Sequence, residues 1–391
     1  MINKKDSKKK IKRANYLSAS QSLNIARHNR KMMRQFEKRN NRKNVPESEY
    51  LAVMKNPGNV VEFDDLHTYF FTDAGTVKAV DGVSFDVPLG KTVGVVGESG
   101  CGKSVTSLSL MQILQRPIGQ IVSGSIRFDT GSKVIDIAKM PSEKMQKVRG
   151  NNISMIFQEP MTSLNPVFRI GTQVDEIIKL HNPEMDKEQV KARTIEMLEM
   201  VSIANCEGVY RMYPHELSGG MRQRVMIAMA LACNPRLIIA DEPTTALDVT
   251  IQAQILDLLR NLKDKINSSI MLITHDLGVI AEMADYVVVM YAGRIVEKGT
   301  ADEIFNHPSH PYTIGLMASK PSVNKKVERL YSIPGKVPNP INMPDYCYFR
   351  DRCEKRFVRC DGPYPGEYSL SPTHTTSCYL YADDQEERQD G

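Results

Sequence analysis

Hydrophobic and polar positions follow two different patterns in the first part of the chain. Over residues 60–63 and 77–87 apolar and polar residues alternate, which predicts antiparallel strands with one buried face. Residues 92–96 form a nearly unbroken apolar run bounded by glycines, as expected for a strand that is buried on both faces. A helical pattern follows over residues 104–114. The two patterns predict an antiparallel β subdomain followed by a buried strand and its helix.

The alternation of strands and helices resumes later in the chain. Residues 237–240 form a second apolar run, and a helical pattern follows over residues 251–265. Another apolar run covers residues 270–273. Strands that alternate with helices in this way predict an α/β fold built on a largely parallel sheet.

Changes in composition divide the chain into segments. Residues 1–50 form a basic and polar N-terminal extension, and residues 58–308 contain the α/β domain. Within that domain, residues 166–235 read as a helical insertion. Residues 309–381 are rich in proline and hold four of the seven cysteines, which predicts a separate C-terminal module. Residues 382–391 form a short acidic tail.

The net charge is unevenly distributed between these segments. The 391 residues carry a formal charge of +5, yet residues 1–44 hold 15 Lys or Arg and only two acidic residues, a net charge of +13. The remaining residues hold 36 basic and 44 acidic side chains, a net charge of −8. The protein is therefore an acidic body with a basic extension.

Composition excludes several classes of protein. A hydrophobic content of 41% is enough for a buried core, so the chain as a whole is not disordered. No run of about 18 apolar residues occurs, so no membrane-spanning helix is expected. The polar N-terminus predicts no secretory signal, and seven cysteines in a chain of this size do not form a secreted disulfide scaffold. A reduced cytosolic compartment is expected.

The basic extension could form a helix over residues 18–39. Its apolar positions are Leu23, Ile25, Met32, Met33 and Phe36. Because they form no clean stripe, we expect no stable isolated helix and interpret residues 1–50 as a disordered extension. The alternative hypothesis is that its charge attracts anionic lipid.

A phosphate-binding loop follows the apolar run at residues 92–96. The pattern G-x-x-x-x-G-K-[ST] is met by Gly97, Glu98, Ser99, Gly100, Cys101, Gly102, Lys103 and Ser104. Backbone N–H groups of such a loop surround the phosphates of ATP, Lys103 reaches the β- and γ-phosphates, and Ser104 ligates Mg²⁺. The strand before the loop and the helix after it argue against an ordinary glycine-rich turn. Cys101 is interpreted as a small filler within the loop.

Two carboxylates follow the apolar run at residues 237–240. The carboxyl ends of parallel strands are where ligands gather in open α/β sheets. Asp241 is placed to hold Mg²⁺ through water, and Glu242 to polarise the water that attacks the γ-phosphate. Alone this would be an ordinary strand end, but together with the phosphate loop it predicts a nucleotide-hydrolysing site.

Further motifs narrow the interpretation. Ser218, Gly219 and Gly220 precede a helical stretch and the acidic strand, Gln158 follows a strand-like run, and His275 follows the strand at residues 270–273. Asp248 follows the acidic strand. In this order the motifs resemble the ATP-binding subunit of an ABC transporter over about residues 60–300.

The resemblance implies a role for each motif. Ser218, Gly219 and Gly220 would bind the γ-phosphate of ATP on an opposite subunit, so two subunits would close head-to-tail over two nucleotides. His275 would contact the γ-phosphate and orient the water of Glu242.

The remaining site residues follow from the same resemblance. Gln158 would bind Mg²⁺ together with Ser104 and Asp241, and Asp248 would cross the dimer interface. An aromatic residue upstream of the loop would stack on adenine. Phe70 is favoured over its neighbours Tyr69 and Phe71, and the alternative is that Phe70 is an ordinary core-facing aromatic.

Other segments resemble one group of ABC transporters. Residues 158–166 (QEPMTSLNP), 310–313 (HPYT) and 333–335 (IPG) are similar to those of oligopeptide and dipeptide permease ATPases. The resemblance implies a second homologous ATPase subunit, two membrane permease subunits and, indirectly, a peptide-binding protein. It places the chain at the cytoplasmic face of the cell membrane and implies no nucleic-acid partner.

The cysteines of the C-terminal module have an unusual spacing. Cys347, Cys353, Cys360 and Cys378 follow the pattern C-x₅-C-x₆-C-x₁₇-C, without the C-x₂-C pair typical of structural zinc. Four cysteines with irregular gaps can hold a [4Fe–4S] cluster, and the resemblance to permease ATPases also implies one. The alternative is a set of reduced cysteines that pack a small core.

Two other functions compete with peptide import. A soluble ABC protein that acts on ribosomes or DNA would use the basic extension to bind nucleic acid, but such proteins commonly carry two phosphate loops and this chain has one. A catalytically dead regulator is disfavoured because all four residues expected to act in hydrolysis are present, namely Lys103, Asp241, Glu242 and His275. We therefore expect an ATPase that powers import of oligopeptides or dipeptides.

Overall fold

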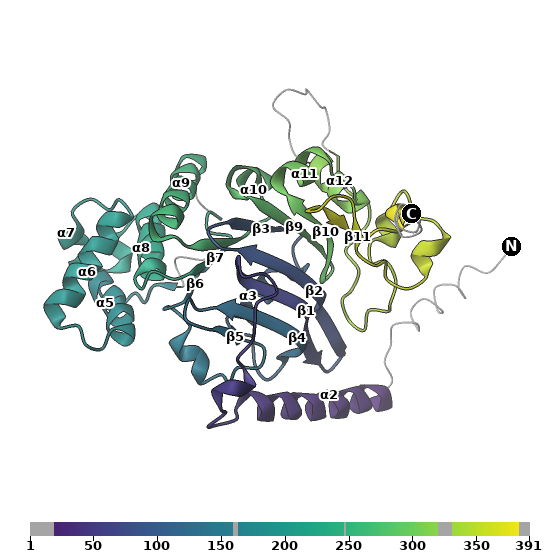
Figure 1. Ribbon diagram of the computed structural model, residues 1–391, viewed down its shortest axis with the longest axis horizontal. Helices are drawn as coiled ribbons and strands as arrows, with labels where there is room; N and C mark the ends of the chain where they lie inside the picture. Colours follow the sequence, from purple (N-terminus) through teal and green to yellow (C-terminus); the bar gives the residue numbers. More distant parts are fainter. Residues whose placement is uncertain (1–18, 159–162, 246–247, 320–330, 383–391) are drawn as a thin grey trace.

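The computed structural model describes residues 19–158, 163–245, 248–319 and 331–382. Two sheets form its centre, with helices above them and at one end (Figure 1). Within the described ranges, no helix combines the length and the apolar character needed to cross a membrane.

The larger sheet has eight strands in the order β11-β12-β10-β9-β3-β8-β7-β6. The strands β6, β7, β8, β3 and β9 run parallel, and β10, β12 and β11 continue the sheet antiparallel. Their bounds are β3 (Thr92–Val96), β6 (Ile153–Ile156), β7 (Leu237–Asp241), β8 (Ser269–Ile273), β9 (Tyr286–Tyr291), β10 (Arg294–Thr300), β11 (Tyr368–Ser369) and β12 (Thr375–Thr376). Every residue of β3, β7 and β8 is buried, which explains their continuous apolar runs.

The smaller sheet is antiparallel and has the order β2-β1-β4-β5. Its strands are β1 (Asn59–Thr72), β2 (Gly75–Pro88), β4 (Gly119–Asp129) and β5 (Val134–Asp136). Apolar side chains from both sheets and from α3 (Lys103–Leu110) share one core. The predicted α/β fold with an antiparallel subdomain is confirmed.

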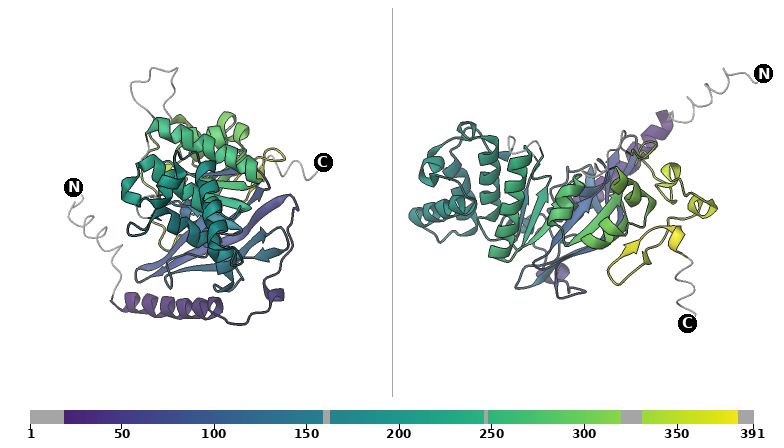
Figure 2. Two further views of the ribbon diagram at one scale, coloured as in Figure 1. Left: turned by 90° about the vertical axis from the view of Figure 1, so that its left-hand side faces the viewer. Right: turned by 90° about the horizontal axis from the view of Figure 1, so that it is seen from above.

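Helices enclose the large sheet and extend from it. The helical insertion contains α5 (Ile170–His181), α6 (Lys187–Met200), α7 (Cys206–Arg211) and α8 (Gly219–Leu231). The other helices are α9 (Val249–Ile266), α10 (Leu277–Met283), α11 (Ala301–Asn306) and α12 (Pro311–Ala318). Short 3₁₀ turns cover η1 (Glu47–Glu49), η2 (Lys144–Lys147) and η3 (Pro214–Glu216). The insertion and the C-terminal module lie at opposite ends of the molecule (Figure 2).

The N-terminal extension differs from its prediction. Residues 19–40 form α2 (Ala19–Asn40), which lies along the antiparallel sheet (Figure 1). The expectation of disorder is wrong for this stretch, and residues 1–18 lie outside the described residues. The ring of Phe36 stacks on that of Phe71 with centroids 6.0 Å apart, and the Asn29 side chain donates to the Thr72 carbonyl at 2.7 Å. Packing on β1 therefore stabilises a helix that would be marginal alone.

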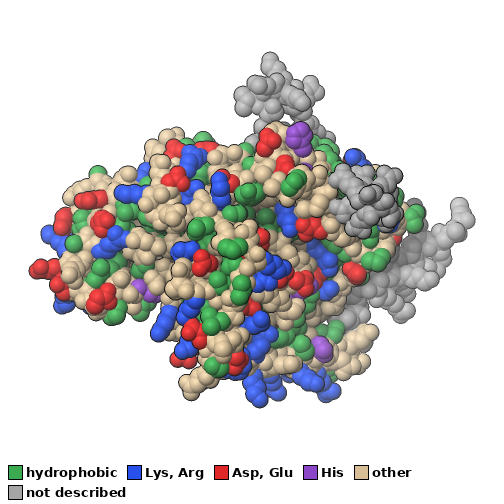
Figure 3. Space-filling model, viewed as in Figure 1, with side chains coloured by type: hydrophobic (Ala, Val, Ile, Leu, Met, Phe, Trp, Pro, Cys, Tyr) green, Lys and Arg blue, Asp and Glu red, His purple; other side chains and the backbone are tan. Residues whose placement is uncertain are grey.

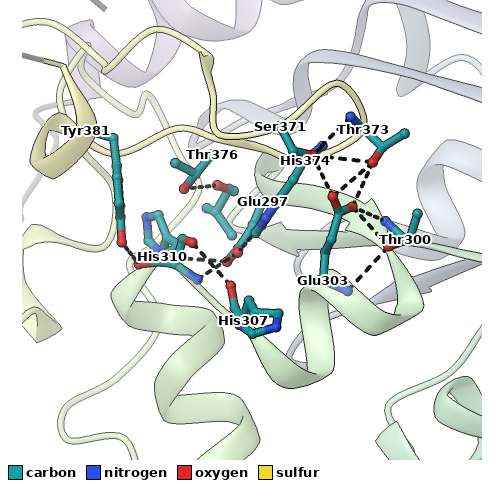
Figure 4. A network of polar contacts seen from close by, with 12 residues as sticks. Glu297, Thr300, Glu303, His307, His310, Ser371, Thr373, His374, Thr376 and Tyr381 are labelled. Atoms are coloured by element: carbon teal, nitrogen blue, oxygen red, sulfur yellow. Dashed lines mark hydrogen bonds and ion pairs between the residues drawn. The ribbon is translucent and has the colours of Figure 1, made fainter. Parts of the chain in front are cut away.

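The C-terminal module is built from turns that pack on β10 and α11. Its 3₁₀ turns are η4 (Arg350–Arg352), η5 (Val358–Asp361) and η6 (Tyr379–Tyr381). Buried Glu297 accepts a hydrogen bond from His374 at 2.7 Å and from the backbone N–H groups of Ser309 and His310 (Figure 4). Glu303 holds the neighbouring loop by accepting from the hydroxyl groups at positions 371 and 373. These polar contacts attach the module to the α/β domain, and the acidic segment 383–391 lies outside the described residues.

Candidate nucleotide-binding site

The predicted phosphate loop connects β3 to α3. Its backbone is packed tightly against neighbouring strands, because a Cβ atom at Gly97 would lie 2.2 Å from the Met290 carbonyl oxygen and one at Gly102 would lie 2.3 Å from that of Ala79. Gly102 also has a φ of 103°, which side-chain-bearing residues rarely adopt. Glycine is therefore required here both for the turn and for the close approach of backbone.

The Lys103 side chain lies inside the loop. Its ammonium group donates to the carbonyl oxygens of Gly97 at 2.7 Å and Glu98 at 3.1 Å, and the residue is buried. The charge is thus held at the centre of the loop, where phosphate oxygens bind in proteins with this motif. Cys101 is buried beside it, and burial raises the pKa of its thiol. A thiol that stays protonated fits the role of filler predicted for it.

Ser104 and Asp241 come together from α3 and β7. The Ser104 hydroxyl donates to Asp241 Oδ1 at 3.1 Å. Asp241 is buried, and desolvation raises the pKa of its carboxyl group. A hydroxyl and a carboxylate at this distance are oxygen donors of the kind that Mg²⁺ prefers, and a cation would offset the cost of burying the charge. Their geometry therefore fits the predicted Mg²⁺ ligands.

Glu242 lies directly after β7 and is held by three side chains. Its carboxylate accepts hydrogen bonds from Gln158 Nε2 at 2.8 Å and from Thr245 Oγ1 at 3.0 Å. His275 Nδ1 lies 3.1 Å from the other oxygen. The backbone of Glu242 has a φ of 50° and its N–H donates to the Ile273 carbonyl, which ties the end of β7 to β8. The structure thus brings Gln158, Glu242 and His275 together, and it adds Thr245, which sequence reasoning missed.

Residues of the C-terminal region also contact the phosphate loop. The Arg352 guanidinium pairs with both oxygens of the Glu98 carboxylate, at 2.6 and 3.0 Å. The backbone N–H of Glu98 donates to the hydroxyl oxygen of Tyr312 at 2.9 Å. Sequence reasoning missed Arg352 and Tyr312 because they lie more than 200 residues from the loop and belong to no local motif.

The residues predicted to act across a dimer are exposed helix starts. Ser218 caps α8 by accepting a hydrogen bond from the Met221 N–H, and a Cβ atom at Gly219 would meet nothing within 4 Å. Asp248 caps α9 in the same way and is exposed. Among the described residues, no hydrogen bond links these side chains to the phosphate loop. They are therefore open to another molecule.

The three candidate adenine-stacking residues have different environments. The Tyr69 hydroxyl donates to Asp81 at 2.6 Å, and Phe71 is buried against Phe36. Phe70 is only partly buried, and a Cβ atom at Gly119 would lie 2.8 Å from its ring. Phe70 also packs partly against the apolar core, so its role in stacking on adenine stays a prediction.

The four cysteines of the C-terminal module line one small cavity. Cys347, Cys353, Cys360 and Cys378 share its wall with His310. Burial raises the pKa of Cys347 to about 11 and that of Cys378 to about 12. Across the described residues, no three His, Cys, Asp or Glu side chains form a group that could hold a metal ion. The four cysteines therefore share one small cavity without forming a recognised metal-binding group in the described residues.

A phosphate loop between β3 and α3, with a paired carboxylate site on β7, defines a P-loop ATPase. Comparisons with known proteins narrow the class. The family described as ABC transporter matches residues 80–245, and the family described as oligopeptide/dipeptide transporter, C-terminal region, matches residues 296–360. The solved structure of a dimeric ATP-binding cassette bound to ADP and Pi is 25% identical, with a TM-score of 0.55, and covers 62% of this chain and 98% of its own.

Curated relatives cover most of the chain. The oligopeptide transport ATP-binding protein AppD of Bacillus subtilis is 49% identical over 329 residues, 84% of this chain and 99% of its own length. The dipeptide transport ATP-binding protein DppD of Lactococcus lactis is 49% identical over 321 residues, 82% of this chain and 90% of its own length. The chain belongs to the oligopeptide and dipeptide transport ATP-binding proteins of the ABC transporter family, and it is an ABC-type ATPase. These relatives lend no support to the alternative of a soluble protein that acts on ribosomes or nucleic acid.

Proposed function

We propose that this chain hydrolyses ATP to drive import of oligopeptides or dipeptides through partner membrane permeases. The observation that carries the proposal is the Glu242 carboxylate held by Gln158 and His275 beside the Ser104–Asp241 pair. Relatives that are 47–49% identical over 82–84% of this chain are named for oligopeptide or dipeptide transport. The ATPase site and the C-terminal region are therefore expected to serve the same class of cargo.

Each residue of the site has its own role in ATP hydrolysis. Lys103 and the N–H groups of the phosphate loop neutralise the phosphate oxygens of ATP. Ser104, Asp241 and Gln158 would hold Mg²⁺, which would supply positive charge to stabilise the phosphates. Glu242 orients and polarises the attacking water, and His275 positions that water through its contact with Glu242. Phe70 stacks on the adenine ring.

A second ATPase subunit completes each site. The N-terminus of α8 starts at the Ser218 cap. Open space surrounds Gly219, whereas Gly220 lies against the Ile251 side chain. Such a helix start carries partial positive charge and binds phosphate. We assign it to the γ-phosphate on a homologous subunit arranged head-to-tail, with Asp248 at the interface.

An apolar groove next to Gln158 is the proposed contact with a permease. It has a volume of about 320 Å³ and lies between β6 and the helices α5 and α8 of the insertion. Its lining includes Met111, Phe157, Leu180, Met226 and Met229, and Leu180 is 71% exposed. A helix of the permease would place its apolar face here. Because Phe157 precedes Gln158, movement of the permease helix would be transmitted to Glu242. The chain would act at the cytoplasmic face of the membrane. A peptide-binding protein would be involved only indirectly.

The four cysteines are proposed to hold a [4Fe–4S] cluster. The support is that all four cysteines line one small cavity. In such a cluster each thiolate binds a different iron, so the sulfur atoms lie farther apart than the ligands of a single ion. The cluster would cross-link turns that have little secondary structure of their own. Anaerobic purification of the chain with a Cys360→Ser variant, and with Cys233→Ser as the matched control, tests this by iron content and by absorbance at about 400 nm. Iron that is absent from the wild-type chain would refute it.

The proposed function is tested by measuring ATP hydrolysis and peptide uptake by the wild-type chain and by a Glu242→Gln variant. The chain, its permeases and the second ATPase are co-purified from native membranes and reconstituted in vesicles. We expect peptide-stimulated ATP hydrolysis and uptake, and a fall in hydrolysis of at least about 100-fold for Glu242→Gln with ATP still bound. Near-normal hydrolysis by the variant would refute the role of Glu242, and hydrolysis without peptide uptake would refute the proposed cargo.

A further inference from the structure

The helix α2 is fixed to the protein by one face only. Phe36 and Asn29, both buried, point to β1, where they contact Phe71 and the Thr72 carbonyl. Near its C-terminal end, Arg39 donates to the Ile121 carbonyl at 2.6 Å. These contacts come from one side of the helix and set its rotation. The opposite face is therefore turned away from the domain.

That outward face carries a row of positive charge. Its exposed basic residues, hereafter the basic face, are Arg27, Arg30, Lys31, Arg34 and Lys38. At 100° per residue they fall within an arc of about 100°, centred opposite to Phe36. Leu23 lies in the same arc near the start of the helix and is 59% exposed. The helix thus presents a continuous basic stripe with an apolar residue at one end.

The charges of the basic face have no acidic partners in the described part of the chain. The acidic residue of α2, Glu37, points to Gln120, which donates to it at 2.7 Å, and lies 3.9 Å from Arg116. Like charges three and four residues apart repel each other and destabilise a helix. A row of this kind becomes favourable when an extended negative surface lies against it.

The position of α2 indicates which negative surface that is. Its last residue, Asn40, accepts a hydrogen bond from the Ser142 N–H, and the Ser142 hydroxyl lies 3.5 Å from Gln112. The Gln112 carbonyl in turn accepts from Arg149, which lines the groove assigned to the permease. Lys and Arg side chains also gather along the edge of the molecule where α2 lies (Figure 3). The C-terminal end of α2 is thus linked through Ser142 and Gln112 to a residue of that groove, which places this end of the helix on the side of the domain assigned to the permease and its bilayer.

We propose that the basic face of α2 binds the anionic headgroups of the membrane surface beside the permease. The inference rests on the proposed function only for the position of the permease. Basic side chains near an anionic leaflet each strengthen binding about five-fold, and the attraction extends over about one Debye length. Leu23 would enter the interface between headgroups and acyl chains.

Vesicle binding by the purified full chain, without permeases or peptide, tests the proposal. Co-sedimentation is measured with phosphatidylcholine vesicles that contain about 30% phosphatidylglycerol, and with pure phosphatidylcholine. The test variant is Arg27→Gln/Lys31→Gln/Arg34→Gln. The matched control removes three exposed charges elsewhere, as Lys187→Gln/Arg211→Gln/Lys265→Gln. A third variant, Arg27→Lys/Arg34→Lys, keeps the charge.

We expect the test variant to bind anionic vesicles at least about 10-fold more weakly, since three charges at about five-fold each set an upper value near 100-fold. The control and the charge-keeping variant should bind within about three-fold of wild type, and wild-type binding should fall with added salt. Equal binding to neutral vesicles, equal loss in test and control variants, or displacement of the vesicles by equimolar RNA would each overturn the proposal. ATP hydrolysis and peptide uptake are measured separately from vesicle binding. A failed vesicle-binding test would therefore leave the proposed function unchanged, and a failed transport test would leave the proposed lipid binding unchanged.

Discussion

The ion pair between the C-terminal module and the phosphate loop leads to a quantitative prediction. Arg352 is 5% exposed at its side chain and Glu98 is 30% exposed. Beyond Glu98, the guanidinium donates to the Pro334 carbonyl at 2.9 Å and lies 3.3 Å from the Tyr291 hydroxyl. In Arg352→Met the side chain keeps its length but loses all of these donors. The variant therefore leaves a partly buried carboxylate without its cation.

The magnitude follows from this burial. Removing one partner of a fully buried ion pair costs about 3–5 kcal/mol, and we reduce this to about 2–3 kcal/mol because Glu98 retains contact with water. The loss is expected in the free energy of unfolding, measured in urea. If half of it loosens the loop that binds ATP, the affinity for nucleotide falls about 10-fold. Titration with a fluorescent ATP analogue measures that affinity.

A double-mutant cycle separates the pair from its surroundings. Arg352→Met and Glu98→Gln, alone and combined, should show an interaction energy of about 1–2 kcal/mol in both assays. The matched control is Arg350→Met, since Arg350 pairs with Asp361 inside the module and is not hydrogen-bonded to the loop. It should lower stability without changing nucleotide affinity. Additive effects within about 0.5 kcal/mol for Arg352 and Glu98 would refute the coupling.

Two further predictions concern the packing of the antiparallel sheet. Phe36→Ala should destabilise the docking of α2 by about 3 kcal/mol and expose residues 19–40 to limited proteolysis. The control is Gln35→Ala, which changes a neighbouring exposed residue and should have neither effect. Equal cleavage of both variants would contradict the docking. The hydrogen bond to Asp81 raises the pKa of His67. This raised pKa stabilises the folded state fully below the unfolded pKa of about 6.5, and the stabilisation is lost as pH rises through the pKa of His67 in the folded state. The free energy of unfolding should therefore fall as pH rises through this range, and His67→Gln should remove that pH dependence. An unchanged pH dependence in the variant would contradict the role of His67.

Several strands and helices follow from the sequence pattern alone. The apolar runs at residues 237–240 and 270–273 became β7 and β8 almost to the residue, because a strand buried on both faces has no polar position to interrupt the run. The first strand is longer than its pattern. The pairing register of β1 with β2 shifts around Asp65, which has a φ of 49°. This bulge interrupts the alternation of apolar and polar residues from which a strand is predicted. The helix predicted to reach residue 114 ends at Leu110, close to the left-handed backbone of Gln112.

Sequence motifs alone predict the chemistry of the ATP site. Lys103, Ser104, Asp241 and Glu242 are recognisable because a phosphate loop needs consecutive N–H groups and a strand end delivers its carboxylates together, and both are local properties. Tertiary structure alone decided what surrounds that site. The Arg352–Glu98 pair and the docking of α2 join residues far apart in the chain, through contacts that leave no periodic or local signature. Their stability comes from burial against partners that only the folded chain brings within reach.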